Sequence, residues 1–141
     1  MKLSSTKIAL GLIVILIIVL TSIIIVFNAR NRIPEEAFVR DWSNITEMQD
    51  EGTYFVYVYA DWCPACAQLR NDISAFHRDQ PNDINLYQLD VDNVVGQVPA
   101  QFGDSGVPTL IIVQNGVWAN QVSGIQSVRD VLDAARDGEY N

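Results

Sequence analysis

Two thiols lie close together in the stretch ADWCPAC, residues 60–66. Cys63 and Cys66 are the only cysteines of the 141 residues, and Pro-Ala separates them. A structural zinc site is excluded because it takes four ligands, whereas the chain adds only one histidine, His77. A structural disulfide here would close a loop too short to restrict the unfolded chain appreciably. The chemistry that remains for this pair is reversible thiol–disulfide exchange.

The pair is predicted to lie where a strand meets a helix. Residues 53–60, TYFVYVYA, are β-branched and aromatic, which is typical of a strand buried on both faces. Apolar residues then recur at helical spacing up to about Arg78: Cys66, Leu69, Ile73 and Phe76. Cys63 would cap this helix, with Pro64 at its first position, where proline is tolerated. Because a helix N-terminus stabilises a thiolate, we expect an exposed, attacking Cys63 and a shielded, resolving Cys66.

The rest of the domain alternates strands and helices. We expect strands at 84–91, 109–114 and 117–122, and helices at 44–50 (capped by Asn44), 94–102 (short and poorly formed) and 127–136. Strands separated by helices favour parallel pairing, and the Asn115-Gly116 hairpin adds an antiparallel edge. The predicted fold class is α/β, with three layers, α/β/α, around a mixed central sheet.

These motifs resemble those of the thioredoxin family. YADWCPAC, followed by GVPT and then by NG and SG, is similar to thioredoxin over about 37–135. The resemblance implies a redox-active Cys63–Cys66 disulfide without a metal or organic cofactor, acting on protein thiols and disulfides. It also implies that the Val107–Pro108 bond is cis. By the same resemblance, a shallow substrate groove is bordered by these residues: Trp62, Val107, Pro108 and Gly124.

The chain departs from thioredoxin in three places. Tyr57 stands where thioredoxin has a buried aspartate, and Gln88 stands where it has the partner lysine. In thioredoxin these two groups help move the proton of the inner cysteine, so the resemblance leaves the proton acceptor of Cys66 open, with water and Asp61 as the candidates. The dipeptide between the cysteines is Pro-Ala rather than Gly-Pro, which makes a reduction potential well above that of thioredoxin plausible.

The first part of the chain is of a different kind. Residues 8–27 carry no charge, and as a helix they are about 30 Å long, which matches the hydrocarbon core of a bilayer. No small-x-small cleavage site follows them, so we expect an uncleaved anchor rather than a signal peptide. The predicted organisation is a short cytoplasmic tail (1–7), a transmembrane signal-anchor helix (8–27), a linker (28–36) and a thioredoxin-like domain (37–141). The amino terminus, Lys2 and Lys7 precede the span and Arg30 and Arg32 follow it, which slightly favours a cytoplasmic N-terminus.

Past the anchor the chain is strongly acidic. Residues 33–141 hold five arginines against 17 acidic residues, a net charge of −12, which disfavours nucleic acid as a partner. We therefore expect a single-pass, cell-membrane thiol–disulfide oxidoreductase with an extracytoplasmic domain, a reductase recharged by a membrane electron carrier. The alternatives are a disulfide oxidase or isomerase of the same fold, a non-catalytic binding or chaperone module, and a reductase of inverted topology.

Overall fold

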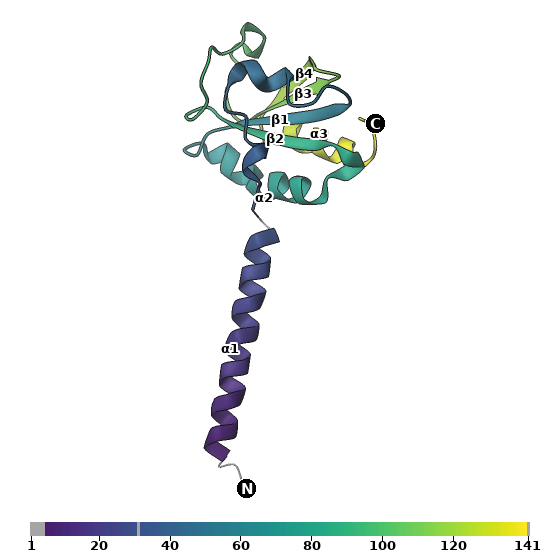
Figure 1. The fold of residues 1–141 in the computed structure, drawn as a ribbon. Helices are drawn as coiled ribbons and strands as arrows, with labels where there is room; N and C mark the ends of the chain where they lie inside the picture. The colour runs from purple at the N-terminus through teal and green to yellow at the C-terminus, as the bar shows by residue number, and fades with distance from the viewer. Residues whose placement is uncertain (1–4, 31, 141) are drawn as a thin grey trace. The chain divides into compact units, whose positions relative to one another are not determined.

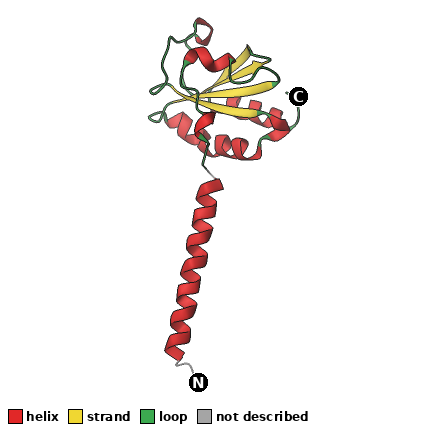
Figure 2. Ribbon diagram, in the orientation of Figure 1, coloured by secondary structure: helices red, strands yellow, loops and turns green. Residues whose placement is uncertain are grey.

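The computed structural model describes residues 5–30 and 32–140, and the chain divides into two compact units, residues 1–32 and 33–141. Part of the predicted N-terminal tail, residues 1–4, lies outside the described residues. Figures 1 and 2 show the first unit as one long helix and the second as a sheet with helices packed on it.

The first unit is helix α1 (Ser5–Arg30), and its 26 residues correspond to about 39 Å of length. Lys7–Ala29 is long and apolar enough to cross a membrane, and none of its 18-residue hydrophobic window is buried within the protein. Both hydroxyls of the segment bond back to the helix: Thr21 Oγ1 and Ser22 Oγ donate to the Ile18 carbonyl, at 2.9 and 2.7 Å. A helix whose polar groups are satisfied internally suits an apolar solvent.

The second unit is built on a four-stranded sheet in the order β2-β1-β3-β4. Its strands are β1 (Thr53–Tyr59), β2 (Asn85–Asp90), β3 (Thr109–Gln114) and β4 (Val117–Ser123). Five consecutive residues of β1 are buried, which fits its place in the interior of the sheet and the apolar run in its sequence (Figure 2). The predicted mixed sheet is confirmed.

The direction of β3 differs from the simple expectation that strands separated by helices pair in parallel. Among the four described strands, β1 and β2 are the only parallel pair, whereas β3 runs antiparallel to β1, with Thr109 opposite Val58. The reason is that residues 91–108 form no crossover helix: the helix expected at 94–102 is reduced to a 3-10 turn, Ala100–Phe102, after Pro99. Residues 91–108 remain at the end of the sheet where β1 ends. Strand β3 therefore starts at that end and runs back in the direction opposite to β1.

Two layers cover the sheet. On one face, helices α2 (Pro64–Asp79) and α3 (Ile125–Arg136) pack over Phe55 and Tyr57. On the other face, Trp42 and Phe102 lie against Tyr54, Val56 and Val58, with 5.1 Å between the Trp42 and Phe102 ring centroids. This second layer consists of short 3-10 turns and loops rather than α-helix.

The helix expected at 44–50 is one of these turns, Trp42–Thr46. Asp41 caps it in place of the predicted Asn44, because the Asp41 carboxylate accepts the Ser43 N–H at 2.9 Å. A second bond, from the Ser43 hydroxyl at 2.8 Å, holds the same oxygen. The turn therefore begins earlier than its sequence pattern indicates.

Candidate redox site

Cys63 caps the N-terminus of α2, directly after the turn that follows β1. Its backbone is extended (φ −81°, ψ 113°), and its Sγ accepts the Cys66 N–H at 3.1 Å. Pro64 occupies the first turn, where its missing N–H leaves no partner unsatisfied. The N–H groups and the positive end of the helix dipole favour negative charge on this sulfur, which is the form that attacks disulfides.

The expectation that Cys63 is exposed is wrong. Cys63 is 4 % exposed and Cys66 6 %, and both thiols are free. The loop before β3 packs on the end of α2, so the Cys63 thiol donates to the Val107 carbonyl at 3.8 Å. Both sulfurs are thus shielded, and what distinguishes them is the hydrogen bond that Cys63 receives from the helix.

The other predicted site residues gather around this point. The Val107–Pro108 peptide bond is cis, as the resemblance implied. Gly124, which precedes α3, donates its N–H to the Pro108 carbonyl at 2.9 Å, with φ +91° at that glycine. Trp62 precedes Cys63 and is 67 % exposed, the most exposed aromatic side chain of the described domain. An aromatic surface residue, a buried dithiol and a loop with a cis proline therefore meet at one end of the sheet.

Burial, and to a lesser extent the neighbouring Cys63 sulfur, raise the pKa of Cys66 to about 11. The backbone of Ala60 and the Tyr57 hydroxyl act in the opposite direction and favour the Cys66 thiolate. Burial also raises the pKa of Tyr57, and Cys66 adds to this rise, so the phenol is neutral at physiological pH. Cys66 therefore carries its proton in the reduced protein and has to lose it before it can attack.

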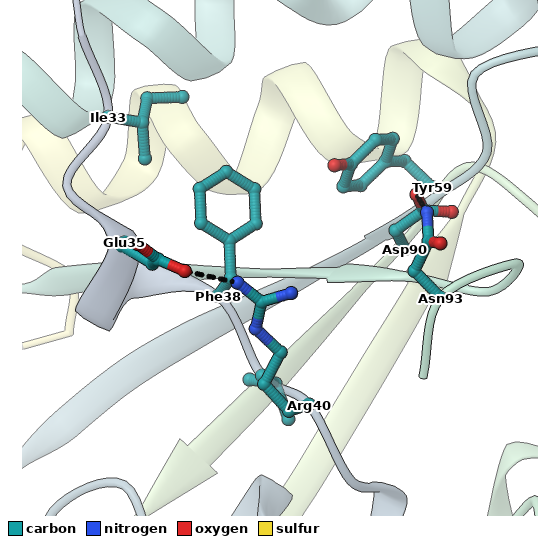
Figure 3. Close-up of a pocket in the computed structure, with 8 residues that line it drawn as sticks. Ile33, Glu35, Phe38, Arg40, Tyr59, Asp90 and Asn93 are labelled. Atoms are coloured by element: carbon teal, nitrogen blue, oxygen red, sulfur yellow. Dashed lines mark hydrogen bonds and ion pairs between the residues drawn. The ribbon is translucent and has the colours of Figure 1, made fainter. Parts of the chain in front are cut away.

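One hollow adjoins this dithiol, and a second lies beside the first. One of about 370 Å³ is lined by Cys66, Tyr57 and Gln88 and extends to the exposed side chains of Asp61 and Arg70. A second of about 370 Å³ shares three residues with it: Ile33, Phe38 and Tyr59. Figure 3 shows the second hollow. The exposed ion pair between Glu35 and Arg40 lines it, with 2.9 Å between the carboxylate oxygen and the guanidinium nitrogen.

Sequence reasoning located Tyr57 and Gln88 as departures from thioredoxin but gave no sign of these hollows. Phe38, Arg70 and Ser74 line the first of them and were not singled out. Phe38 bridges to Gln88 in a short parallel pairing, a long-range contact without a local sequence signal. The one available hint was that Tyr57 and Gln88 replace a charged pair of thioredoxin, although Cys66 still has to be deprotonated.

A buried dithiol at a helix N-terminus on this fold defines a thiol–disulfide oxidoreductase. The sequence profile described as Thioredoxin matches residues 37–137. Thioredoxin of Staphylococcus haemolyticus is 29 % identical over 94 residues, covering 64 % of this chain and 89 % of that protein. Human thioredoxin-related transmembrane protein 1 is 25 % identical over 91 residues, covering 64 % of this chain and 32 % of that protein.

The structure of Fasciola hepatica thioredoxin has the same fold, with a TM-score of 0.58 at 16 % identity, over 70 % of this chain and 97 % of that one. The chain belongs to the thioredoxin family. It is a thiol–disulfide oxidoreductase, and thioredoxins work with a redox-active disulfide and protein thiols and disulfides as substrates.

Proposed function

We propose that this protein is a membrane-anchored reductase that acts on disulfides of extracytoplasmic proteins through Cys63-Pro64-Ala65-Cys66. The observation that carries the proposal is the N–H of Cys66 donating to the Cys63 sulfur at 3.1 Å, at the start of α2. That bond and the helix dipole stabilise the thiolate of Cys63 and mark it as the nucleophile. Cys66 is the resolving thiol.

In the proposed cycle, the Cys63 thiolate attacks one sulfur of a substrate disulfide, and the other substrate sulfur leaves as a thiolate. Trp62, Val107, Pro108 and Gly124 hold the substrate segment against the dithiol. The Cys66 thiolate then attacks Cys63 and releases the second substrate thiol, which leaves the enzyme as the Cys63–Cys66 disulfide. The substrate gains two electrons and the enzyme loses two, so a reductant must recharge it.

Residues 8–27 are the proposed anchor, in a bilayer that residues 1–7 face from the cytoplasmic side. The length and composition of α1 support this, and so does the match to a relative named as a transmembrane protein. Residues 28–36 then link the anchor to an extracytoplasmic domain, residues 37–141. On that side of the membrane, a membrane electron carrier is the proposed source of reducing equivalents.

The first experiment is the reduction potential of the full-length protein in detergent micelles, equilibrated in glutathione buffers and read by thiol trapping. For a reductase we expect a reduction potential of about −270 mV, which is that of thioredoxin. A reduction potential of about −120 mV, which is that of the strong periplasmic oxidant, would contradict the proposed reductase activity and favour an oxidase or isomerase. The Pro-Ala dipeptide is the feature that makes the second outcome worth testing.

Topology has its own test. A protease-sensitive tag added after residue 141 is expected to be cleaved on intact cells, whereas the same tag before residue 1 should be protected. The reverse pattern would place the domain in the cytoplasm and make the protein a tethered reductase of the cytosolic pool. The matched control is lysed cells, in which both tags should be cleaved.

A further inference from the structure

The cavity beside Cys66 lies on the helix-covered side of the sheet, and both apolar and polar side chains line it. Tyr57 and Gln88 are register partners in the parallel β1–β2 pair, so their side chains project from the same face. Together with Cys66 they line its buried part, while Asp61 and Arg70, both exposed, line the part that opens to solvent. A volume of about 370 Å³ leaves room for several water molecules.

Two polar groups in this cavity lack partners. Tyr57 is 3 % exposed and Gln88 is 6 % exposed. The Tyr57 hydroxyl lies near enough to the Cys66 sulfur to favour its thiolate, but within residues 5–30 and 32–140 neither this hydroxyl nor Gln88 Nε2 makes a hydrogen bond. Buried polar groups left in this state are costly, and in a cavity with sufficient room they are normally hydrogen-bonded to water. The two unpaired groups therefore mark where water binds, next to the thiol that must change its protonation state.

We propose that water held by the Tyr57 hydroxyl and the Gln88 side-chain amide is the immediate proton acceptor and donor of the Cys66 thiol. This inference rests on the exchange reaction proposed above and adds the group that makes its second step possible. Tyr57 and Gln88 are positioning residues in this scheme, since they act on Cys66 through the water.

The step balances as follows. In the mixed disulfide, Cys66 gives its proton to the cavity water, which passes it to bulk solvent past Asp61 and Arg70. The Cys66 thiolate attacks Cys63 Sγ, forming the Cys63–Cys66 bond and breaking the bond between Cys63 and the substrate. The substrate sulfur leaves with the electron pair and takes a proton from solvent. In the reverse direction, the water returns a proton to Cys66.

Few other groups near Cys66 could accept its proton. The titratable and charged groups that face it are Cys63 at the start of α2, Tyr57 and Tyr59 on β1, Asp61 in the following turn and Arg70 on α2. Tyr59 stacks on Tyr57 with ring centroids 5.7 Å apart, and burial raises the pKa of both phenols. Asp61 is the one carboxylate among them and it is exposed, so a D61N variant tells whether it, rather than the water, accepts the proton.

The test follows both steps of exchange in the full-length protein in detergent, with a chromogenic aryl disulfide. Attack by Cys63 releases one coloured thiolate, and resolution by Cys66 releases a second, so stopped-flow absorbance separates the two rates. The variants are Y57F, Q88M and D61N. The matched control is Y54F, which removes a buried hydroxyl from the opposite face of β1, where it donates to the Ile45 carbonyl at 2.8 Å.

We expect Y57F and Q88M each to slow the second release by about tenfold at pH 7 and to move its pH profile upward, with the first release unchanged. Y54F and D61N should leave the pH profile of the second release where it is. The inference is overturned if neither Y57F nor Q88M moves the profile, or if D61N alone does. A shift in Y57F without one in Q88M would also overturn the shared water, because a direct bond from Tyr57 would then suffice. If the wild-type protein released only one thiolate, the proposed function itself would fail, whatever the variants do.

Discussion

At the scale of single residues, the two sulfurs differ in what their surroundings do to negative charge. Cys63 receives the N–H of Cys66 at a helix N-terminus, which stabilises its thiolate. Burial raises the pKa of Cys66 to about 11, which keeps that thiol protonated. Both side chains are equally hidden from solvent, so exposure does not set the order of attack. In the proposed cycle, the order follows from the hydrogen bond and the helix dipole.

Exchanging each sulfur for oxygen tests this division of labour. C63S is expected to lose reduction of a protein disulfide at least about a thousandfold and to form no adduct, because the nucleophile is gone. C66S is expected to lose turnover to a similar extent but to accumulate a mixed disulfide through Cys63. Non-reducing gels and intact-mass measurement distinguish the two variants.

The double variant C63S/C66S is the control for a binding module. If it still prevented aggregation of an unfolded client as well as the wild-type protein does, the cysteines would be dispensable for that activity and the chaperone alternative would gain support. Mixed disulfides that accumulate in C63S instead of C66S would reverse the assigned roles.

The raised pKa of Cys66 also predicts a pH-dependent stability. The pKa of about 11 in the folded protein lies above the ordinary thiol value of 9.0, which means that the folded state holds the proton of Cys66 more tightly than the unfolded state does. This stabilisation is complete below about pH 9 and is lost as the pH rises towards 11. The reduced protein should therefore fall in Tm by about 5 °C relative to the oxidised protein across that interval.

Differential scanning of both redox forms in detergent at a series of pH values checks this. The oxidised form is the internal control, because its Cys66 has no proton to lose, whereas Tyr57 is present in both forms. Parallel Tm curves for the two forms would contradict the raised pKa of Cys66.

Sequence reasoning reached most of the site at this scale because its signals are local. The spacing of Cys63 and Cys66, the proline after Cys63 and the GVPT segment are short motifs, and the structure brings these residues together. The burial of Cys63 was not predictable in the same way. It depends on Val107, 44 positions away, packing on the end of α2.

At the scale of elements, residues 91–108 connect β2 to β3 with no helix other than a 3-10 turn at Ala100–Phe102, where a short and poorly formed helix was expected at 94–102. The segment is tied to the N-terminal part of the domain by two backbone bonds, Trp42 N–H to the Val95 carbonyl at 3.1 Å and Val95 N–H to the Arg40 carbonyl at 2.9 Å. Because it remains at one end of the sheet, it delivers Val107 and Pro108 to the dithiol. Its anchoring is therefore a structural requirement of the site.

Gly96 next to this anchor is the position to test. Its φ is +89°, and a Cβ there would lie 2.6 Å from Asp41 Oδ1. Gly52 has a similar φ of +84° but open space around it, so G52A measures the backbone strain alone. We expect G52A to lower the free energy of unfolding by about 1–2 kcal/mol and G96A to lower it further.

Urea denaturation of the full-length protein in detergent gives both values. G96A should also slow reduction of a protein disulfide, since it disturbs the segment that carries Val107, whereas G52A should not. Equal losses of stability in the two variants would show that Asp41 moves aside freely and that the contact does not hold the segment.

The elements were predictable to the extent that their patterns are periodic. Buried β1 and the amphipathic α2 and α3 were expected within a few residues of their observed bounds. The direction of β3 was not, because it is fixed by where residues 91–108 run, and that path depends on pairing with residues 40–42 rather than on any period in the sequence. Likewise, the 94–102 segment contains Pro99 and a positive-φ Gly96, which interrupt a helix.

At the scale of the whole molecule, charge is the dominant long-range property. The sequence after residue 32 carries five arginines and 17 acidic residues, a net charge of −12, and four of the arginines are already in ion pairs with carboxylates. The field of such a domain extends beyond single contacts and attracts cationic substrates while repelling anionic ones. It acts on the encounter with the substrate, before any bond exchange.

Two disulfide peptides that differ only in Lys or Glu residues around the disulfide test this. At low salt the cationic peptide is expected to react about tenfold faster with Cys63 than the anionic one, and the ratio should approach about one in 1 M salt, where the Debye length is about 3 Å. A neutral small disulfide, whose rate should not depend on salt, is the control. If the preference came from Asp61 beside the exposed Trp62 alone, D61N would abolish it. Because the charge is spread over the domain, D61N should leave most of the ratio in place, and only neutralising several acidic residues together should remove it.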